Sequence, residues 1–161
     1  MLFRSAEGSG KGVSGRSKVA NKEELLRTAA DLLQRFRQPV LAETFLPGCE
    51  FTVAILGTGE EAEALGVLEI VFLQETSGAY TYDNKSHWEG KVDVRHATDA
   101  KAGEAAQLAL AAWRALRGRD CGRIDIRCDA EGKPHFLEIN PLPGMRPGYS
   151  DLCFKIGRAH V

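Results

Sequence analysis

The sequence predicts an α+β fold built from antiparallel sheets with packed helices. Two segments carry apolar residues at the spacing of an amphipathic helix, and several short runs are rich in β-branched and aromatic residues. Turns that contain glycine or proline separate most of these runs, as in antiparallel meanders and hairpins. At 161 residues and 17.6 kDa, the chain has the length of about one ordinary domain.

The N-terminal part is predicted to be a glycine loop followed by a helix. Residues Ser5–Lys18 are rich in glycine, serine and lysine, which predicts a mobile loop with many backbone N–H and hydroxyl donors. No convincing strand precedes this loop. Asn21 and Glu24 have the spacing of a capping box, and the apolar residues that follow predict a helix to about Arg37, ended by Pro39.

The middle of the chain predicts an antiparallel meander and a second helix. Val40–Phe45 and Glu50–Leu56 are separated by Leu-Pro-Gly, and a Gly-Thr-Gly-Glu turn leads into Ala64–Phe72. Residues 74–98 are polar and read as irregular. An amphipathic helix follows from about Lys101 to Arg117. Its apolar face is expected to carry Ala105, Leu108, Ala109, Ala112, Trp113 and Leu116.

The last unit is predicted to be a β-hairpin of Cys121–Cys128 and His135–Asn140. A tip at Glu131-Gly132 sets Asp125 opposite Glu138 and Arg123 opposite Asn140. Strand alternation then divides the hairpin into two faces. The polar face is expected to carry Arg123, Asp125, Arg127, Phe136, Glu138 and Asn140. The apolar face is expected to carry Ile124, Ile126, Leu137 and Ile139.

The polar face of this hairpin has the chemistry of a cation site. Directly opposed carboxylates repel each other unless a cation or a shared proton lies between them, as for Asp125 and Glu138. With the amide of Asn140 they present hard oxygen ligands, which suit Mg²⁺ or Mn²⁺ rather than Zn²⁺. Mg²⁺ held by few carboxylates usually binds substrate phosphates as well, which points to a nucleotide. The alternative is a solvated strand face where Arg123 and Arg127 neutralise the acids.

Composition excludes several classes of partner. The net charge of −1 lacks the basic excess of a general nucleic-acid binder or a polybasic membrane anchor. No apolar run approaches the roughly 18 residues of a membrane span, and no secretory signal is visible, so a cytoplasmic location is expected. The four cysteines form no C-x-x-C pair, which predicts reduced thiols rather than a zinc site or disulfides. They are Cys49, Cys121, Cys128 and Cys153.

The glycine loop matches a dinucleotide fingerprint only in its letters. Gly10–Gly15 fits G-x-G-x-x-G, but the next helix begins too late to receive a pyrophosphate at its N-terminus, which excludes a Rossmann site. The Walker A pattern is also absent from the sequence. Two interpretations stay open: a flap that folds over phosphates, and a linker.

Taken in order, these segments resemble the ATP-grasp ligases, and most closely the D-alanine–D-alanine ligase family. The resemblance covers Ser5–Lys155 and is carried by SAEGSGKG, PVLAETFLPGCEFTV and RIDIRCDAEGKPHFLEINPLPGM, the last being the most specific. The family phosphorylates the carboxylate of one D-alanine with ATP, and the amine of a second attacks the acyl phosphate to make a peptidoglycan precursor dipeptide. The resemblance implies an ATP-grasp fold, ATP with Mg²⁺ or Mn²⁺, and small amino-acid substrates; we expect the intact enzyme to be a homodimer.

The resemblance also implies roles for single residues. Asp125, Glu138 and Asn140 would be the metal ligands, with Glu138 bridging two ions. Arg123 and the Gly144 backbone would stabilise a tetrahedral oxyanion.

Further residues match the nucleotide and substrate positions of the family. Glu43 and Leu46 resemble the adenine hinge, and Glu50 the ribose ligand. Glu7 and Ser9 match the phosphate-side loop, and Lys85 matches a phosphate-facing lysine. Ser150, with Gly144, matches the site of the acceptor carboxylate.

Some positions depart from the family pattern. Phe3-Arg4 stands where the family usually has a nucleotide-contacting Lys-Pro, and Ser86-His87 where many members have a tyrosine that closes the loop onto the substrate. We therefore expect residues 1–155 to be a partial ATP-grasp domain, truncated at both ends and inactive alone. Residues 156–161 resemble a translated sequencing adapter. The alternatives are an ATP-grasp ligase with another carboxylate or acceptor, and a non-catalytic cation-binding module.

Overall fold

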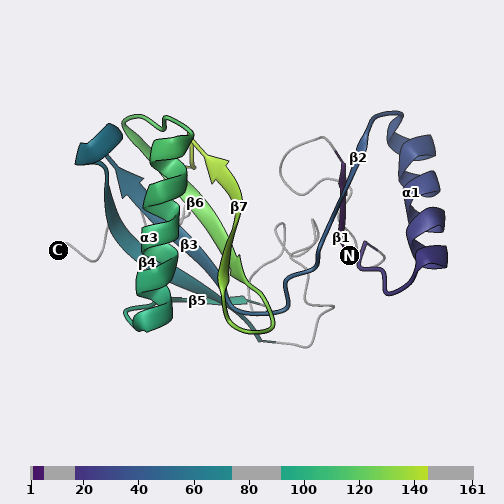
Figure 1. Ribbon diagram of the computed structural model, residues 1–161, viewed down its shortest axis with the longest axis horizontal. Helices are drawn as coiled ribbons and strands as arrows, with labels where there is room; N and C mark the ends of the chain where they lie inside the picture. The colour runs from purple at the N-terminus through teal and green to yellow at the C-terminus, as the bar shows by residue number, and fades with distance from the viewer. Residues whose placement is uncertain (1, 6–16, 74–91, 145–161) are drawn as a thin grey trace. The chain divides into compact units, whose positions relative to one another are not determined.

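The computed structural model describes residues 2–5, 17–73 and 92–144, and for residues 2–5 only the backbone. Helices and strands alternate irregularly along the chain, which confirms the α+β class (Figure 1). The helical elements are α1 (Lys22–Phe36), η1 (Gly59–Glu61) and α3 (Ala100–Ala115). The strands are β1 (Leu2–Ser5), β2 (Val40–Glu43), β3 (Glu50–Leu56), β4 (Glu63–Phe72), β5 (Val92–His96), β6 (Cys121–Cys128) and β7 (Pro134–Asn140). They form two compact units, which are described in turn.

The first unit contains α1 and the two-stranded antiparallel sheet of β1 and β2. The predicted cap of α1 is confirmed, because the Glu24 backbone N–H donates to Asn21 Oδ1 at 2.9 Å. The Glu24 carboxylate in turn accepts from the Ala20 N–H at 2.9 Å, one residue before the cap. Leu32 and Val19 are buried between helix and sheet and hold this unit together.

Two sequence predictions for this unit are wrong. Leu2–Ser5 is a strand because it pairs with β2, although nothing in its four residues indicates a strand. For the same reason Val40–Glu43 does not continue the predicted meander. The chain after β2 turns instead to β6, where Gly48 N–H donates to the Cys128 carbonyl and Cys128 N–H to the Cys49 carbonyl.

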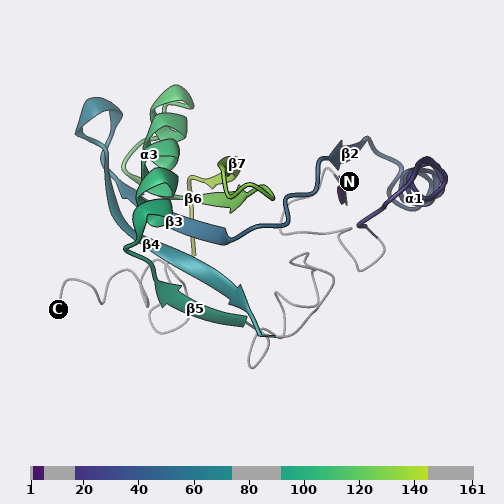
Figure 2. The same cartoon turned by 60° about the horizontal axis from the view of Figure 1, so that its bottom comes forward.

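The second unit is a five-stranded sheet in the order β5-β4-β3-β6-β7, with α3 lying across one face (Figures 1 and 2). β3 pairs antiparallel with both β4 and β6, and β6 with β7. The remaining part of the predicted meander, β3 with β4, is therefore confirmed. β5 lies within the segment that the sequence presents as irregular, and it forms the sheet edge beside β4.

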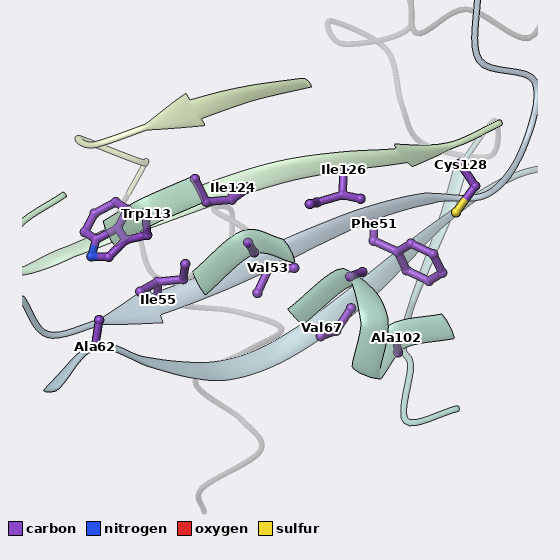
Figure 3. Close-up of a cluster of buried hydrophobic side chains, with 12 residues drawn as sticks. Phe51, Val53, Ile55, Ala62, Val67, Ala102, Trp113, Ile124, Ile126 and Cys128 are labelled. Carbon is purple, nitrogen blue, oxygen red and sulfur yellow. The ribbon is translucent and has the colours of Figure 1, made fainter. Parts of the chain in front are cut away.

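The core lies between α3 and the sheet. α3 buries Ala102, Ala105, Ala109 and Trp113 against alternate residues of β3 and β6. Figure 3 shows Ala102 and Trp113 among the apolar side chains of these strands. Trp113 is fully buried, and its indole N–H donates to the Gly57 carbonyl at 3.1 Å. Leu116 was expected on this face, but it caps the helix and is 54% exposed.

The β6–β7 hairpin has the predicted pairs at its open end and a different register at its tip. Arg123 faces Asn140 and Asp125 faces Glu138, as expected. The tip is a three-residue loop around Glu131, closed by Asp129 N–H donating to the Lys133 carbonyl at 3.0 Å. Gly132 in this loop has φ +84°, a conformation that favours glycine.

A β-bulge on β7 reconciles the two ends of the hairpin. Between Glu138 and Phe136 the register shifts by one, which leaves Leu137 as the extra residue. Phe136 therefore faces Ile126 rather than lying on the polar face, so its predicted place there is wrong. The bulge offsets the odd number of residues in the tip, and this is why Asp125 and Glu138 still meet.

Candidate functional site

The polar residues of β3, β6 and β7 share the sheet face opposite α3. Ile124 and Ile126 are fully buried on the α3 side, so the residues between and beside them on β6 point the other way. Asp125 pairs in register with Thr52 on β3 and with Glu138 on β7, which makes a row across three strands. We refer to Thr52, Arg123, Asp125, Glu138 and Asn140 as the carboxylate row.

Asp125 is the centre of the carboxylate row. Its Oδ1 accepts from Thr52 Oγ1 at 2.8 Å and from Arg123 Nε at 2.9 Å. Its Oδ2 accepts from Arg123 Nη2 at 2.9 Å and from Asn140 Nδ2 at 3.1 Å. The side chain of Asp125 is only 13% exposed and that of Arg123 24%, so this bidentate ion pair is largely shielded from water.

Glu138 lies directly opposite Asp125, and Asn140 lies between the two carboxylates. The Asn140 Nδ2 donates to Asp125 Oδ2 and, at 3.5 Å, to Glu138 Oε1. Donors therefore converge where the two negative charges meet, which offsets the repulsion expected of opposed carboxylates. The three residues expected to bind metal are thus brought together by the fold.

The donor set of this cluster fits a hard divalent cation. Two carboxylates and an amide oxygen are ligands that suit Mg²⁺ or Mn²⁺. The amide nitrogen of Asn140 faces the carboxylates, so ligation by its oxygen requires the amide to turn over. Within the part of the chain that the structure describes, no group of three or more His, Cys, Asp or Glu side chains could hold a metal, so a cation at this cluster would need the Asn140 oxygen as well.

A second ion pair lies on the same face of the sheet, two residues after Asp125 on β6. Arg127 Nη1 donates to Glu50 Oε2 at 3.0 Å, and these two side chains are 10% and 14% exposed. Glu50 and Arg127 face each other in the register of β3 with β6. The ribose ligand expected from the resemblance therefore has an arginine as its immediate neighbour.

Thr52 and the pairing of Arg127 with Glu50 are features that sequence reasoning missed. Both contacts join β3 to β6. Thr52 and Asp125 are 73 residues apart in the sequence, and Glu50 and Arg127 are 77 residues apart. The available signal was the alternation of Glu50 and Thr52 along β3, which sets both on one face. Nothing local indicates that β6 is the strand beside it.

The other expected site residues that the structure describes lie outside the carboxylate row. Glu43 is the last residue of β2 in the first unit, and Leu46 lies before β3 in the second. Gly144 is exposed and follows the end of β7 by four residues. The remaining expected residues lie outside the described part of the chain; they are Glu7, Ser9, Lys85 and Ser150.

Two titratable groups at the tip end of the hairpin have shifted pKa values. A hydrogen bond between His135 Nε2 and Asp129 Oδ2, 2.8 Å apart, lowers the pKa of Asp129, and the backbone N–H groups of Lys133 and Glu131 lower it further. Burial raises the pKa of the Cys128 thiol, which keeps it in the neutral form. The cysteines in the described residues, Cys49, Cys121 and Cys128, are free thiols.

Comparison with known proteins shows which family the sequence matches. A family model described as D-ala D-ala ligase C-terminus matches residues 3–153. The D-alanine–D-alanine ligase of Bordetella petrii is 41% identical over 168 residues, covering 93% of this chain and 48% of that relative. The chain therefore spans about half the length of the curated relatives it matches.

Solved structures share the fold. The D-alanine–D-alanine ligase of Bacillus anthracis complexed with ATP has a TM-score of 0.68 at 19% identity, over 99% of this chain and 46% of that one. The VanG D-Ala:D-Ser ligase of Enterococcus faecalis has a TM-score of 0.63 at 23% identity, over 89% of this chain and 40% of that one. These likenesses confirm the predicted ATP-grasp fold. None of the described helices is both long and apolar enough to cross a membrane.

Proposed function

The chain belongs to the D-alanine–D-alanine ligase family, and on that premise we propose that it forms the nucleotide- and cation-binding part of an ATP-dependent D-alanine–D-alanine ligase. The intact enzyme would join two D-alanines into a dipeptide for peptidoglycan synthesis. Phosphoryl transfer from ATP to the carboxylate of the first D-alanine would form an acyl phosphate and release ADP. Attack by the amine of the second would form the amide bond and release phosphate.

The observation that carries this proposal is the carboxylate row. Asp125 and Glu138 are opposed across a strand pair, with a shielded arginine and an amide directed at them. A purely structural strand face has little reason to gather two carboxylates in one row, because like charges directly opposite destabilise the sheet. A site that receives a nucleotide-bound cation has such a reason.

The residues of the row divide the work of such a reaction. Asp125, Glu138 and Asn140 would hold Mg²⁺, which when bound neutralises phosphate charge during transfer. Arg123 lies beside Asp125 and would stabilise the negative charge that develops on the attacked carbonyl, together with the Gly144 backbone N–H. Arg123 and Gly144 lie at the same end of the β6–β7 hairpin, because Arg123 faces Asn140, the last residue of β7, and Gly144 follows Asn140 by four residues.

The remaining assignments rest on the family resemblance. We propose that Glu50 binds the ribose, with Glu43 and Leu46 at the adenine and Lys85 at the phosphates. We also propose that Glu7 and Ser9 act in the phosphate-side loop and that Ser150 binds the acceptor carboxylate.

Thermal unfolding of the 161-residue chain with ATP, with and without Mg²⁺, tests the proposal. A ligand that binds only the folded state raises stability by about 2.7 kcal/mol at a hundredfold excess over its Kd. We expect a Mg²⁺-dependent rise that is lost in Asp125→Ala. Asp93→Ala is the matched control, because Asp93 is an exposed carboxylate on the edge strand β5, and this variant should keep the rise.

Each outcome distinguishes between functions. A cooperatively unfolding chain that shows no ATP-dependent shift would count against the nucleotide site. Cation binding by a chain that shows no ATP-dependent shift would favour a non-catalytic cation-binding module. For the full-length protein, phosphate release with D-alanine alone, and with other amines as acceptor, separates D-alanine–D-alanine ligation from joining a different acceptor.

A further inference from the structure

Thr52 is the buried polar residue closest to the centre of the carboxylate row. It is 6% exposed and directly opposite Asp125 in the register of β3 with β6. Its hydroxyl donates to Asp125 Oδ1 at 2.8 Å. A buried hydroxyl is costly unless it is hydrogen-bonded, and here its partner is the carboxylate proposed to bind the cation.

The hydroxyl is not required for packing at this position. Thr52 faces Leu68 on the other side of β3, and Leu68 is fully buried with Ala54 in an apolar cluster. Valine has nearly the shape of threonine and would suit these neighbours and the strand conformation. The contact that distinguishes threonine from valine here is therefore the hydrogen bond to Asp125.

The other contacts of Asp125 differ in how they respond to a cation. Arg123 carries a positive charge and holds both carboxylate oxygens, so a divalent cation on Asp125 would repel it. Asn140 presents its amide nitrogen, which must turn away before its oxygen can bind a metal. The Thr52 hydroxyl carries no net charge, so its hydrogen bond is compatible with a cation on the same carboxylate.

We propose that Thr52 is a positioning residue that holds the Asp125 carboxylate in place for a divalent cation. The hydrogen bond comes from β3, a strand paired on both sides, and it orients Asp125 while Arg123 and Asn140 rearrange. Hydrogen bonds behind metal ligands act in this way at many sites, and losing one typically lowers metal affinity by about 10- to 100-fold. The inference rests on the proposed function, because it requires a cation at Asp125.

Titration of the 161-residue chain with Mn²⁺, with free Mn²⁺ counted by electron paramagnetic resonance, tests the role of Thr52. We expect Thr52→Val to weaken Mn²⁺ binding by about 10-fold or more. Thr52→Ser keeps the hydroxyl and should bind Mn²⁺ close to the unmutated value. Asp125→Asn is the reference for loss of the site.

Thr58→Val is a matched control for the loss of a hydroxyl. Thr58 Oγ1 accepts from the Asp120 N–H at 3.1 Å in the turn after β3, outside the carboxylate row. The variant therefore removes a hydrogen-bonded hydroxyl from the same unit and should leave Mn²⁺ affinity unchanged. Urea unfolding of all variants separates a change in affinity from a change in stability.

The outcomes decide the inference separately from the function. If Thr52→Val binds Mn²⁺ as the unmutated chain does while Asp125→Asn does not, the role of Thr52 is refuted and the cation site stands. If Thr52→Ser, which keeps the hydroxyl, is as weak as Thr52→Val, the hydroxyl by itself does not hold the Asp125 carboxylate, and the inference is overturned. If the unmutated chain binds no more Mn²⁺ than Asp125→Asn, the proposed cation site itself is refuted, and the inference with it.

Discussion

Replacing Gly122 by alanine is expected to destabilise the second unit by crowding Trp113. Gly122 lies on β6 next to Arg123, beneath the buried indole. A Cβ at this position would lie 2.4 Å from Trp113 Cζ3, 2.5 Å from Cη2 and 3.1 Å from the Asn140 carbonyl oxygen. Carbon atoms normally approach to about 3.5–4.0 Å, so either the ring or the strand must move.

The expected cost follows from what holds Trp113 in place. The ring is fully buried and its N–H donates to the Gly57 carbonyl, so it cannot tilt without losing contacts. Overfilling a packed core costs about 1–3 kcal/mol. Alanine recovers about 0.5–1 kcal/mol over glycine in a strand, because it restricts the unfolded chain. From the middle of these two ranges, the net loss for Gly122→Ala should be about 1 kcal/mol in the free energy of unfolding, and at most about 2.5 kcal/mol.

Urea unfolding of two single variants and one double variant measures this coupling. Trp113→Phe replaces the indole by a single smaller ring and removes the outer edge that the new methyl would strike. Gly122→Ala should then cost less in the Trp113→Phe background than in the unmutated chain. Gly103→Ala is the control, since a Cβ there meets nothing within 4 Å and alanine favours a helix by about 1 kcal/mol.

Opposite signs for the two glycine replacements are the key result. The reasoning is refuted if Gly122→Ala is as stable as the unmutated chain, or if its cost is the same with phenylalanine at position 113. Either result would mean that α3 and β6 adjust to the extra methyl group without loss. Stabilisation by Gly103→Ala would show that the assay resolves changes of the expected size.

Three further predictions concern the site and the hairpin. In the full-length protein, Asp125→Asn and Glu138→Gln should each abolish ligase turnover by removing charge from the cation site, and normal phosphate release in either would contradict the site. The hydrogen bond from His135 lowers the pKa of Asp129, so its stabilising effect is present above about pH 4 and lost as the pH falls through the lowered value. Asp129→Asn should therefore reduce stability in urea at neutral pH but not in strong acid, whereas a pH-independent difference would argue against this linkage. Burial raises the pKa of Cys128, so iodoacetamide should label it far more slowly in the folded chain than in urea, and equal rates by mass spectrometry would disprove its burial.

The β6–β7 hairpin shows how a correct prediction can rest on a wrong detail. The opposition of Asp125 and Glu138 follows from an assumed two-residue tip at Glu131-Gly132. The structure has a three-residue tip and a bulge at Leu137, and the two differences cancel before Asp125 is reached. A bulge depends on how a strand bends against its neighbours, so neither composition nor alternation indicates it.

The strand β2 and the edge strand β5 show where local patterns mislead. The run from Val40 has strand character, as predicted, but its pairing depends on β1, which precedes α1 in the chain. β5 has only five residues and is polar on one side, and it becomes a strand because β4 offers a free edge. In both cases the partner, and not the segment, decides the structure.

The sequence by itself determined the α+β class, the capped helix α1, the amphipathic α3 and the meeting of Asp125, Glu138 and Asn140 in one hairpin. These features depend on residues close together in the chain, where periodicity, caps and turn lengths set the geometry. The tertiary structure alone decided that β3 lies beside β6, and so brought Thr52 to Asp125 and Glu50 to Arg127. Strand pairing over more than 70 residues is selected by burial of a shared apolar face under α3, and no local pattern carries that information.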